Sequence, residues 1–152
     1  MDRRAVLDSV VQAAQEIIPA LTSEPVDGVD VDQGEPESLD VSVVVGFAAS
    51  LRGFLVVQMS EKTALAVAGR MLGQDCRELG SMEQSCLSEL GNMVMGTATG
   101  ILESDGYHLK VAVPAVVVGR HRLSAPGDGK SEVARLAWGG EEIWLKVVAE
   151  EA

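Results

Sequence analysis

Two apolar, β-branched segments lie close together in the chain: Leu39-Asp-Val-Ser-Val-Val-Val-Gly-Phe-Ala-Ala49 and Gly53-Phe-Leu-Val-Val-Gln-Met59. Valine and phenylalanine favour extended backbone, because branched and aromatic side chains pack well on a pleated sheet. The short stretch Ser50-Leu-Arg-Gly53 between the two segments is typical of a hairpin connection. The pattern therefore predicts two paired strands.

Three further segments have the hydrophobic spacing of amphipathic helices. From Arg3 to Pro19, apolar residues recur every three or four positions, and the proline marks the expected exit from the helix. A second helix is predicted to begin after Ser60, whose hydroxyl suits an N-cap, and to end at Gly73. The third and longest helix is predicted from Ser81 to Glu103.

The remaining apolar segments are predicted to be strands. The segment from Tyr107 to Val118 is interrupted by Pro114, which lacks a backbone donor and so indicates a sheet edge or a bulge. Two more strands, from Glu132 to Trp138 and from Glu141 to Val148, are joined by Gly139-Gly140. A two-residue glycine connection favours a type I′ hairpin turn.

The order of these elements indicates an α/β protein of the α+β type. The acidic segment from Glu24 to Asp40 contains valines among glycines and prolines, which suggests a short edge strand. With that strand included, a helix followed by three strands occurs twice, and an extra helix lies between the two halves. We expect residues 1–152 to form one domain, in which the long central helix packs on a mainly antiparallel sheet.

The charge of the chain restricts the classes of partner. Its 12 basic and 23 acidic side chains give a formal net charge of −11 at pH 7. Nucleic acid and anionic membrane surfaces would be repelled over most of the protein, so another protein is the expected partner. The sequence predicts a cytoplasmic chain without a membrane span, because Asp8 interrupts the apolar run that a signal peptide would need. Cys76 and Cys86 are expected to be reduced.

The long helix carries an unusual polar face. Its predicted core side comprises Leu87, Leu90, Val94, Met95, Ala98, Ile101 and Leu102, and the opposite side comprises Ser85, Glu89, Asn92, Gly96, Thr99 and Gly100. A glycine inside a helix costs about 1 kcal/mol relative to alanine. Gly96 and Gly100 on the solvent side are therefore explained only if a partner must come close to the helix backbone.

Glu89 and Asn92 are three residues apart and so share one helix face. An isolated Glu-x-x-Asn pair is usually an ordinary solvated feature. Here Ser85 precedes the pair by four positions, and Pro114 follows Asn92 by 22 positions. This arrangement resembles the motif of the CheC, CheX and FliY phosphatases of bacterial chemotaxis. The segments from Gly53 to Gly73 and from Val113 to Gly119 also resemble that family, and a single motif copy in a chain of this length is most similar to its CheX branch.

The resemblance implies a CheC-like fold and a phosphatase that hydrolyses the aspartyl phosphate of a CheY-like response-regulator receiver. By that resemblance Glu89 and Asn92 are the functional pair, Ser85 leads the motif and Pro114 is its structural end. Asn92 would orient the attacking water, and Glu89 would ion-pair with a lysine of the receiver. The receiver would supply Mg²⁺, and this chain would bind no cofactor or metal. The resemblance also implies a homodimer, for which the apolar strand from Leu39 to Ala49 is expected to be an exposed edge.

Several other readings stay open. The same helix could hold a receiver or a flagellar-switch protein without hydrolysis, as a non-catalytic interaction module. The segment Gly127-Asp-Gly129-Lys130-Ser131 ends like a phosphate loop, but no helix is predicted to follow it, so a plain turn is favoured. His108 and His121 are expected to be structural or surface residues. Asp8-x3-Gln12-x2-Gln15 repeats the motif spacing without its Glu or Asn, so any second site is expected to be inactive.

Overall fold

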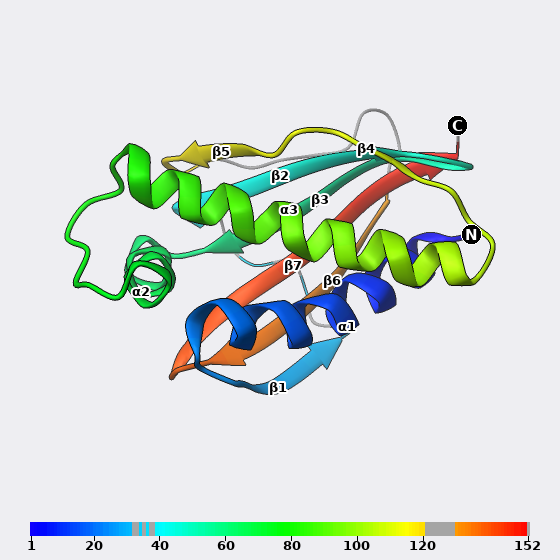
Figure 1. Cartoon of the computed structure of the whole chain (residues 1–152). Helices are drawn as coiled ribbons and strands as arrows, with labels where there is room; N and C mark the ends of the chain where they lie inside the picture. The colour runs from blue at the N-terminus through cyan, green and yellow to red at the C-terminus, as the bar shows by residue number, and fades with distance from the viewer. Residues whose placement is uncertain (32–33, 35, 37–38, 121–129, 152) are drawn as a thin grey trace.

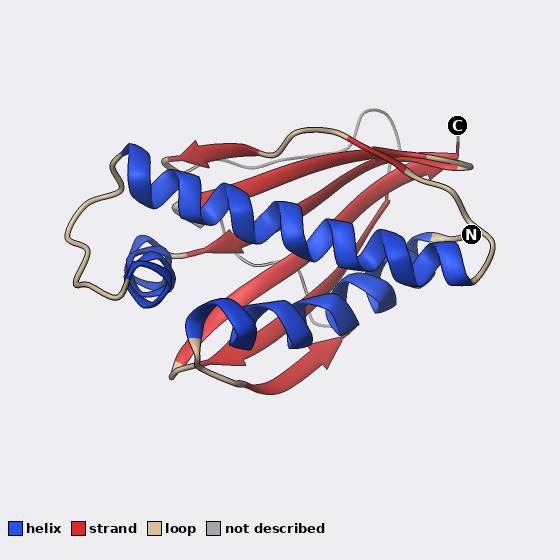
Figure 2. Ribbon diagram, in the orientation of Figure 1, coloured by secondary structure: helices blue, strands red, loops and turns tan. Residues whose placement is uncertain are grey.

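The computed structural model describes residues 1–31, 34, 36, 39–120 and 130–151. The elements follow the order α1 (Arg3–Thr22), β1 (Val26–Val31), β2 (Val41–Ala48), β3 (Leu51–Met59), α2 (Glu61–Leu72), α3 (Ser81–Ser104), β4 (Lys110–Val111), β5 (Ala115–Val118), β6 (Lys130–Trp138) and β7 (Glu141–Glu151). In this part of the chain the strands form one seven-stranded sheet of order β1-β6-β7-β3-β2-β4, with β5 also paired to β2. Helices α1 and α3 lie side by side across one face of the sheet (Figures 1 and 2).

Every strand pair in the sheet is antiparallel. The fold class predicted from the sequence is thereby confirmed. α1 precedes β1, β2 and β3, while α3 precedes the strands β4 to β7, and α2 lies between the two halves. The predicted edge strand of the acidic segment is β1, which among the described strands pairs with β6 alone.

The hairpin formed by β2 and β3 lies inside the sheet. Val41 pairs with Met59 at one end and Ala48 with Arg52 at the other, so the connection is Ala49-Ser50 and is shorter than predicted. The prediction that this first strand is an exposed edge is wrong, because β4 and β5 pair with its other side. The alternating pattern of one strand does not show which distant segment will cover its second side.

Gly53 allows the hairpin to pair closely with β7. A Cβ at this position would lie only 1.9 Å from the backbone oxygen of Val148. No side chain can be accommodated at such a distance without moving the strand, so the glycine is required for this pairing.

The helix ends follow local chemistry with one exception. The Asp2 carboxylate caps α1 by accepting a hydrogen bond from the Ala5 N–H at 2.8 Å. Ser60 caps α2, which ends at Gly73 with φ +70°, as predicted. The predicted end of α1 at Pro19 is wrong, because the helix continues to Thr22 and the Ser23 N–H donates to the Pro19 carbonyl. The missing donor and the ring of proline disturb the turn that precedes it, so the turn that follows it can still form.

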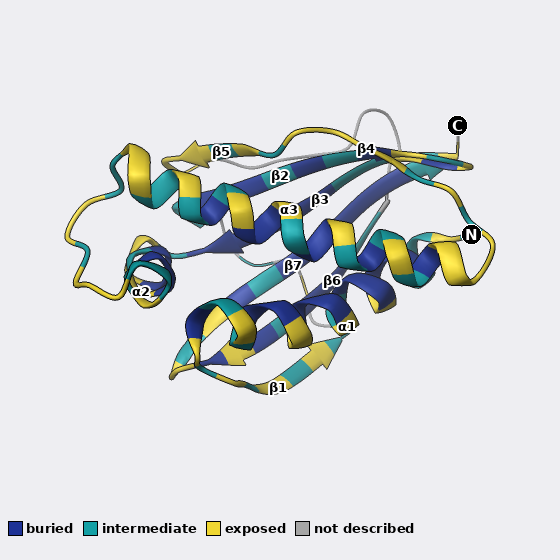
Figure 3. Ribbon diagram, viewed as in Figure 1, coloured by how far each residue is buried: buried dark blue, intermediate teal, exposed yellow. Residues whose placement is uncertain are grey.

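The core lies between the helices and the sheet (Figure 3). The predicted core face of α3 is confirmed for Leu87, Leu90, Val94, Met95, Ala98 and Leu102, which are buried, whereas Ile101 is half-buried. Gly91 is also buried, and a Cβ there would lie 2.6 Å from Cγ1 of Val43. The absence of a side chain at Gly91 thus allows α3 to pack closely on β2. This close packing sets the distance between the sheet and the outward face of α3.

Pro114 divides the predicted strand into β4 and β5, and both halves pair with β2. Gly139 and Gly140 join β6 to β7 with φ values of +55° and +77°, in agreement with the predicted type I′ turn. Of the phosphate-loop-like segment, residues 127–129 lie outside the described residues. Lys130 and Ser131 begin β6, as expected from the absence of a following helix.

Candidate functional site

The outward face of α3 carries the candidate residues. Ser85, Glu89, Asn92, Gly96 and Gly100 are all exposed, as their helical spacing predicts. Thr99 differs from this group, because it is half-buried and its hydroxyl donates to the Met95 carbonyl at 2.8 Å. The exposed members therefore form one continuous polar and small-residue strip along the helix.

A hollow of 470 Å³ opens beside this strip. One wall is α3, and the other is the segment that connects β4 to β5. The lining residues are Ser88, Glu89, Asn92 and Gly96 from α3, Val111 from the end of β4, and Ala112, Val113 and Pro114 from the connection. The fold thus places Pro114 at the same hollow as Asn92, although the two residues are far apart in the sequence.

The connecting segment is held against the sheet edge by backbone contacts. The Ala112 N–H donates to the Gly46 carbonyl at 2.9 Å. A Cβ at Gly46 would lie 3.4 Å from the Ala112 Cβ, which is ordinary van der Waals contact, so the segment lies close against β2 at this point. Pro114 then interrupts the ladder, and the segment 112–114 runs beside the helix between β4 and β5. Pro114 therefore shapes the wall of the hollow.

Glu89 and Asn92 have no side-chain hydrogen bond or ion pair with the part of the chain that the structure describes. Both side chains are exposed at the hollow and carry polar groups that the fold does not use. A carboxylate offers acceptors only, whereas a carboxamide offers both donors and acceptors. This pair can therefore bind a cation and orient a small polar molecule of an external partner at the same time.

The two glycines of the strip have no structural cause within the described chain. A Cβ at Gly96 or at Gly100 would meet no atom within 4 Å. This contrasts with Gly91 on the same helix, where the sheet leaves no room. Each of these glycines lowers the stability of the helix by about 1 kcal/mol relative to alanine. Packing inside the described chain does not offset this loss.

The comparison with protein families matches residues 41–135 to the model described as chemotaxis phosphatase CheX. This match runs from β2 into β6, so it includes α3, the hollow and Pro114. The chain belongs to the chemotaxis phosphatase CheX family. This membership identifies it as an enzyme of the phosphatase class, as the sequence predicted.

Individual relatives agree with the CheX assignment. The CheY-P phosphatase CheX of Thermotoga maritima is 28% identical over 131 residues, which cover 79% of each chain. A CheC-like superfamily protein from Shewanella sp. PV-4 has a TM-score of 0.85 at 20% identity, over 99% of both chains. A structure of a CheX-CheY-BeF3-Mg²⁺ complex from Borrelia burgdorferi gives a TM-score of 0.80 at 22% identity, over 95% of this chain and 97% of that one. At such identities the two structures establish the common fold.

The two cysteines are unsuited to nucleophilic chemistry. Both are free thiols. Burial raises the pKa of Cys86, and the neighbouring Cys76 and Glu83 raise it further. Desolvation also raises the pKa of Cys76, with added contributions from Glu83 and Asp75. With their pKa values raised, both thiols stay protonated near neutral pH. They are therefore poor nucleophiles, because the thiolate is the reactive form.

The other candidate groups lie outside this hollow. His108 is exposed in the loop between α3 and β4, and His121 lies outside the described residues. On α1, Asp8, Gln12 and Gln15 are exposed, and Asp8 is engaged with Arg4 at 3.2 Å. Within the described ranges no group of three His, Cys, Asp or Glu side chains is arranged to hold a metal ion. Of the helices described, none combines the length and apolar character needed to cross a membrane.

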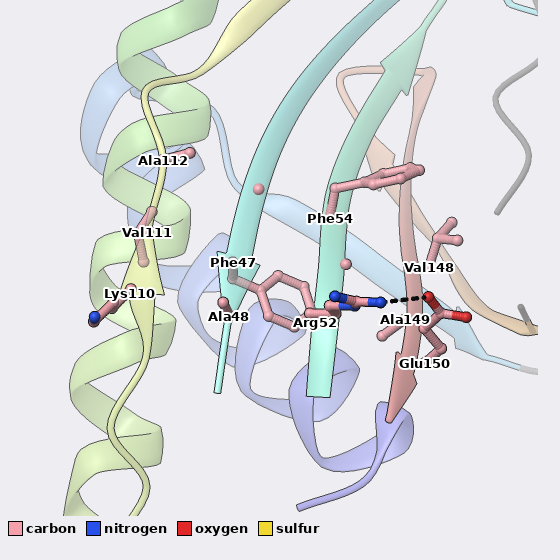
Figure 4. A pocket seen from close by; sticks show the side chains of 12 residues that line it. Phe47, Ala48, Arg52, Phe54, Lys110, Val111, Ala112, Val148, Ala149 and Glu150 are labelled. Atoms are coloured by element: carbon pink, nitrogen blue, oxygen red, sulfur yellow. Dashed lines mark ion pairs between the residues drawn. The ribbon is translucent and has the colours of Figure 1, made fainter. Parts of the chain in front are cut away.

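A second hollow of 630 Å³ lies at the end of the sheet formed by β2, β3, β4 and β7 (Figure 4). Phe47, Phe54 and Val148 contribute its apolar surface, and Arg52 and Glu150 form an ion pair of 3.6 Å at its side. Its Arg52 and Glu150 are already paired with each other, whereas Glu89 and Asn92 at the hollow beside α3 have no such partner within the described chain. The hollow beside α3 is therefore the candidate active site.

Sequence reasoning found Glu89, Asn92, Gly96 and Pro114 at this site but missed the other half of its lining. Ser88, Val111, Ala112 and Val113 line the hollow and were not predicted to do so. Pro114 could have pointed to these residues. It belongs to the same motif as Asn92, so the residues just before it were to be expected near the helix.

Proposed function

We propose that this chain accelerates hydrolysis of the aspartyl phosphate on a phosphorylated CheY-like receiver. The observation that carries the proposal is the exposed Glu89–Asn92 pair, which lies at a surface hollow and is not engaged by the described chain. Membership in the CheX family supports it. Further support comes from the Thermotoga relative, which is named a CheY-P phosphatase, and from the Borrelia structure, which contains CheY together with CheX.

In the proposed mechanism, Asn92 orients the attacking water. Its carboxamide would enter the receiver's phosphoryl site and hold the water in line with the phosphorus–oxygen bond that breaks. A neutral amide suits this position, because a carboxylate would repel the phosphoryl oxygens. Water attacks phosphorus, the bond to the receiver's aspartyl oxygen breaks, and the aspartate carboxylate and inorganic phosphate are released.

Glu89 is proposed to fix the position of the helix on the receiver. It lies one turn before Asn92, and its carboxylate would ion-pair with a lysine of the receiver active site. The receiver is proposed to supply Mg²⁺, which would neutralise the phosphoryl charge, so this chain would bind no metal of its own. Ser85 lies one turn before Glu89 on the same strip and would also contact the receiver.

Release of inorganic phosphate tests the proposed function. A phosphorylated receiver, incubated with a small amount of this protein, should lose its phosphate faster than the receiver does alone. The alternative is a non-catalytic module that holds a receiver or a flagellar-switch protein on the same helix. In that case the receiver would bind without faster phosphate release, and the proposed activity would be wrong.

The Gly96→Ala variant is expected to be more stable and less active. Alanine at this exposed helix position has space for its Cβ and should raise the free energy of unfolding by about 1 kcal/mol. The added methyl group would nevertheless separate the receiver from the helix backbone, so KM for the phosphorylated receiver should rise several-fold. Thermal unfolding and steady-state phosphate release measure the two effects. An unchanged KM would show that no close approach occurs at this position.

A homodimer is proposed to form through the edge of the sheet at β5. Among the described strands β5 pairs only with β2, and its Val118 is 49% exposed. An unpaired apolar edge can add a strand from a second copy. Light scattering should give twice the protomer mass of 16.0 kDa, and Val118→Lys should give a single protomer. A single-protomer mass for the unmodified chain at micromolar concentration would contradict the dimer.

A further inference from the structure

Some of the exposed large apolar side chains lie on the elements that carry the candidate site. Within the described residues, the exposed large hydrophobics are Met82 at 59%, Val111 at 38%, Val113 at 88%, Val117 at 36% and Val118 at 49%. Val111 and Val113 line the same hollow as Asn92. Single exposed apolar side chains are common on protein surfaces, but two of them at the same hollow as Asn92 indicate an interaction surface.

Met82 belongs to the same helix face as the functional pair. Residues 82, 85, 89, 92 and 96 follow one another at alternating spacings of three and four, which places them on one stripe of α3. Met82 precedes Asn92 by ten positions, or about 15 Å along the helix. The polar pair is therefore bordered by an apolar side chain along the helix at Met82 and by another across the hollow at Val113.

Val113 is held in a defined backbone conformation although its side chain is exposed. It precedes Pro114, and a residue before proline is restricted to extended backbone. On its other side, the Ala112 N–H is bonded to the Gly46 carbonyl. Because the backbone around Val113 is already ordered, this segment loses little conformational entropy when a partner covers it.

Charge attraction cannot supply most of the affinity for the proposed substrate. This chain has a net charge of −11, and a phosphorylated receiver brings the negative charge of its phosphoryl group. A single ion pair at Glu89 would orient the receiver, but attraction over the whole surface would be weak or opposed. Burial of apolar surface does not depend on charge and can provide the missing affinity.

We propose that Met82 and Val113 are the apolar anchors of the receiver-binding surface and supply much of its affinity for the receiver. The partner is a receiver domain that presents apolar side chains at two places beside its phosphorylated aspartate. This inference rests on the proposed phosphatase function and adds the residues that determine affinity. Neither residue takes part in the chemical step, so both should affect KM and leave kcat unchanged.

The test compares charged and conservative substitutions at both positions. Val113→Asp and Met82→Asp should each raise KM for a phosphorylated receiver at least about tenfold, because each buries an unpaired carboxylate in the complex. Val113→Ile and Met82→Leu should stay within about twofold of the unmodified chain. Ala20→Asp, at an exposed position near the end of α1, adds the same charge outside this surface and should leave KM unchanged. Light scattering and circular dichroism verify the fold of each variant.

The outcomes separate this inference from the proposed function. If Val113→Asp and Met82→Asp keep the KM of the unmodified chain while Asn92→Ala loses activity, the apolar anchors are wrong and the phosphatase assignment stands. If the aspartate variants lower kcat and leave KM unchanged, the two residues act in the chemical step, and the inference is also wrong. If the unmodified chain binds a receiver without accelerating phosphate release, the proposed function is wrong. The inference, which rests on that function, is then wrong as well.

Discussion

The Asn92→Ala variant is expected to lower kcat for receiver dephosphorylation by about 100-fold, with KM changed by less than about threefold. Removal of the carboxamide leaves the attacking water without its orienting group, and loss of one positioned polar group in an active site typically costs two or more orders of magnitude. The fold should be unaffected, because Asn92 is exposed and forms no side-chain bond with the described chain. Steady-state release of phosphate from the phosphorylated receiver measures the effect.

The chain offers a matched control for this substitution on α1. Gln15 is an exposed carboxamide that stands at the position equivalent to Asn92 in the repeated spacing. Gln15→Ala therefore removes a similar group from a helix that is not proposed to bind the receiver. We expect its kcat to equal that of the unmodified chain. Equal activity of Asn92→Ala and Gln15→Ala would contradict the role of Asn92.

The Glu89→Ala variant is expected to lower kcat/KM by about 30-fold, mostly through KM. The reason is that the ion pair proposed with the receiver lysine becomes desolvated in the complex, and removal of one partner leaves the other charge buried and unpaired, at a cost of about 2 kcal/mol or more. Glu89→Gln should be similarly impaired, because it keeps the shape of the side chain and loses its charge. Binding of the phosphorylated receiver, measured by titration, should weaken in parallel.

Salt dependence provides a second readout of Glu89. Salt screens the ion pair at Glu89, so the difference in receiver affinity between the unmodified chain and Glu89→Ala should become smaller as ionic strength increases. Glu16→Ala, at an exposed position of α1, serves as the control and should behave as the unmodified chain does. If Glu89→Ala binds the receiver with full affinity and the same salt dependence, the ion pair does not form.

Local patterns were sufficient to predict most elements of the fold. The hairpin β2–β3, the caps of α2 and the Gly139-Gly140 turn follow from residues that are neighbours in the sequence. The interior position of β2 was missed, because it depends on the pairing of β4 and β5 with a strand more than 60 positions earlier. The roles of Gly53 and Gly91 were also missed, since each is defined by a distant segment that approaches closely in space.

In the candidate site, too, the features set by neighbouring residues were predicted and those set by distant segments were not. Helical spacing predicted that Ser85, Glu89, Asn92, Gly96 and Gly100 would share an exposed face, and the structure confirms this. The spacing of 22 positions to Pro114 indicated a connection with the motif but not its geometry. Only the fold shows that Val111 and Val113 form a wall opposite the helix, because this contact requires α3, β2 and β4 to be in place.

The most direct measurement is the rate of phosphate release from an excess of phosphorylated receiver in the presence of a catalytic amount of this protein. The account predicts many turnovers per protein molecule, at a rate at least about tenfold above the receiver's own hydrolysis, and loss of this acceleration in Asn92→Ala. A receiver that binds at the α3 hollow but releases phosphate at its own rate would contradict it.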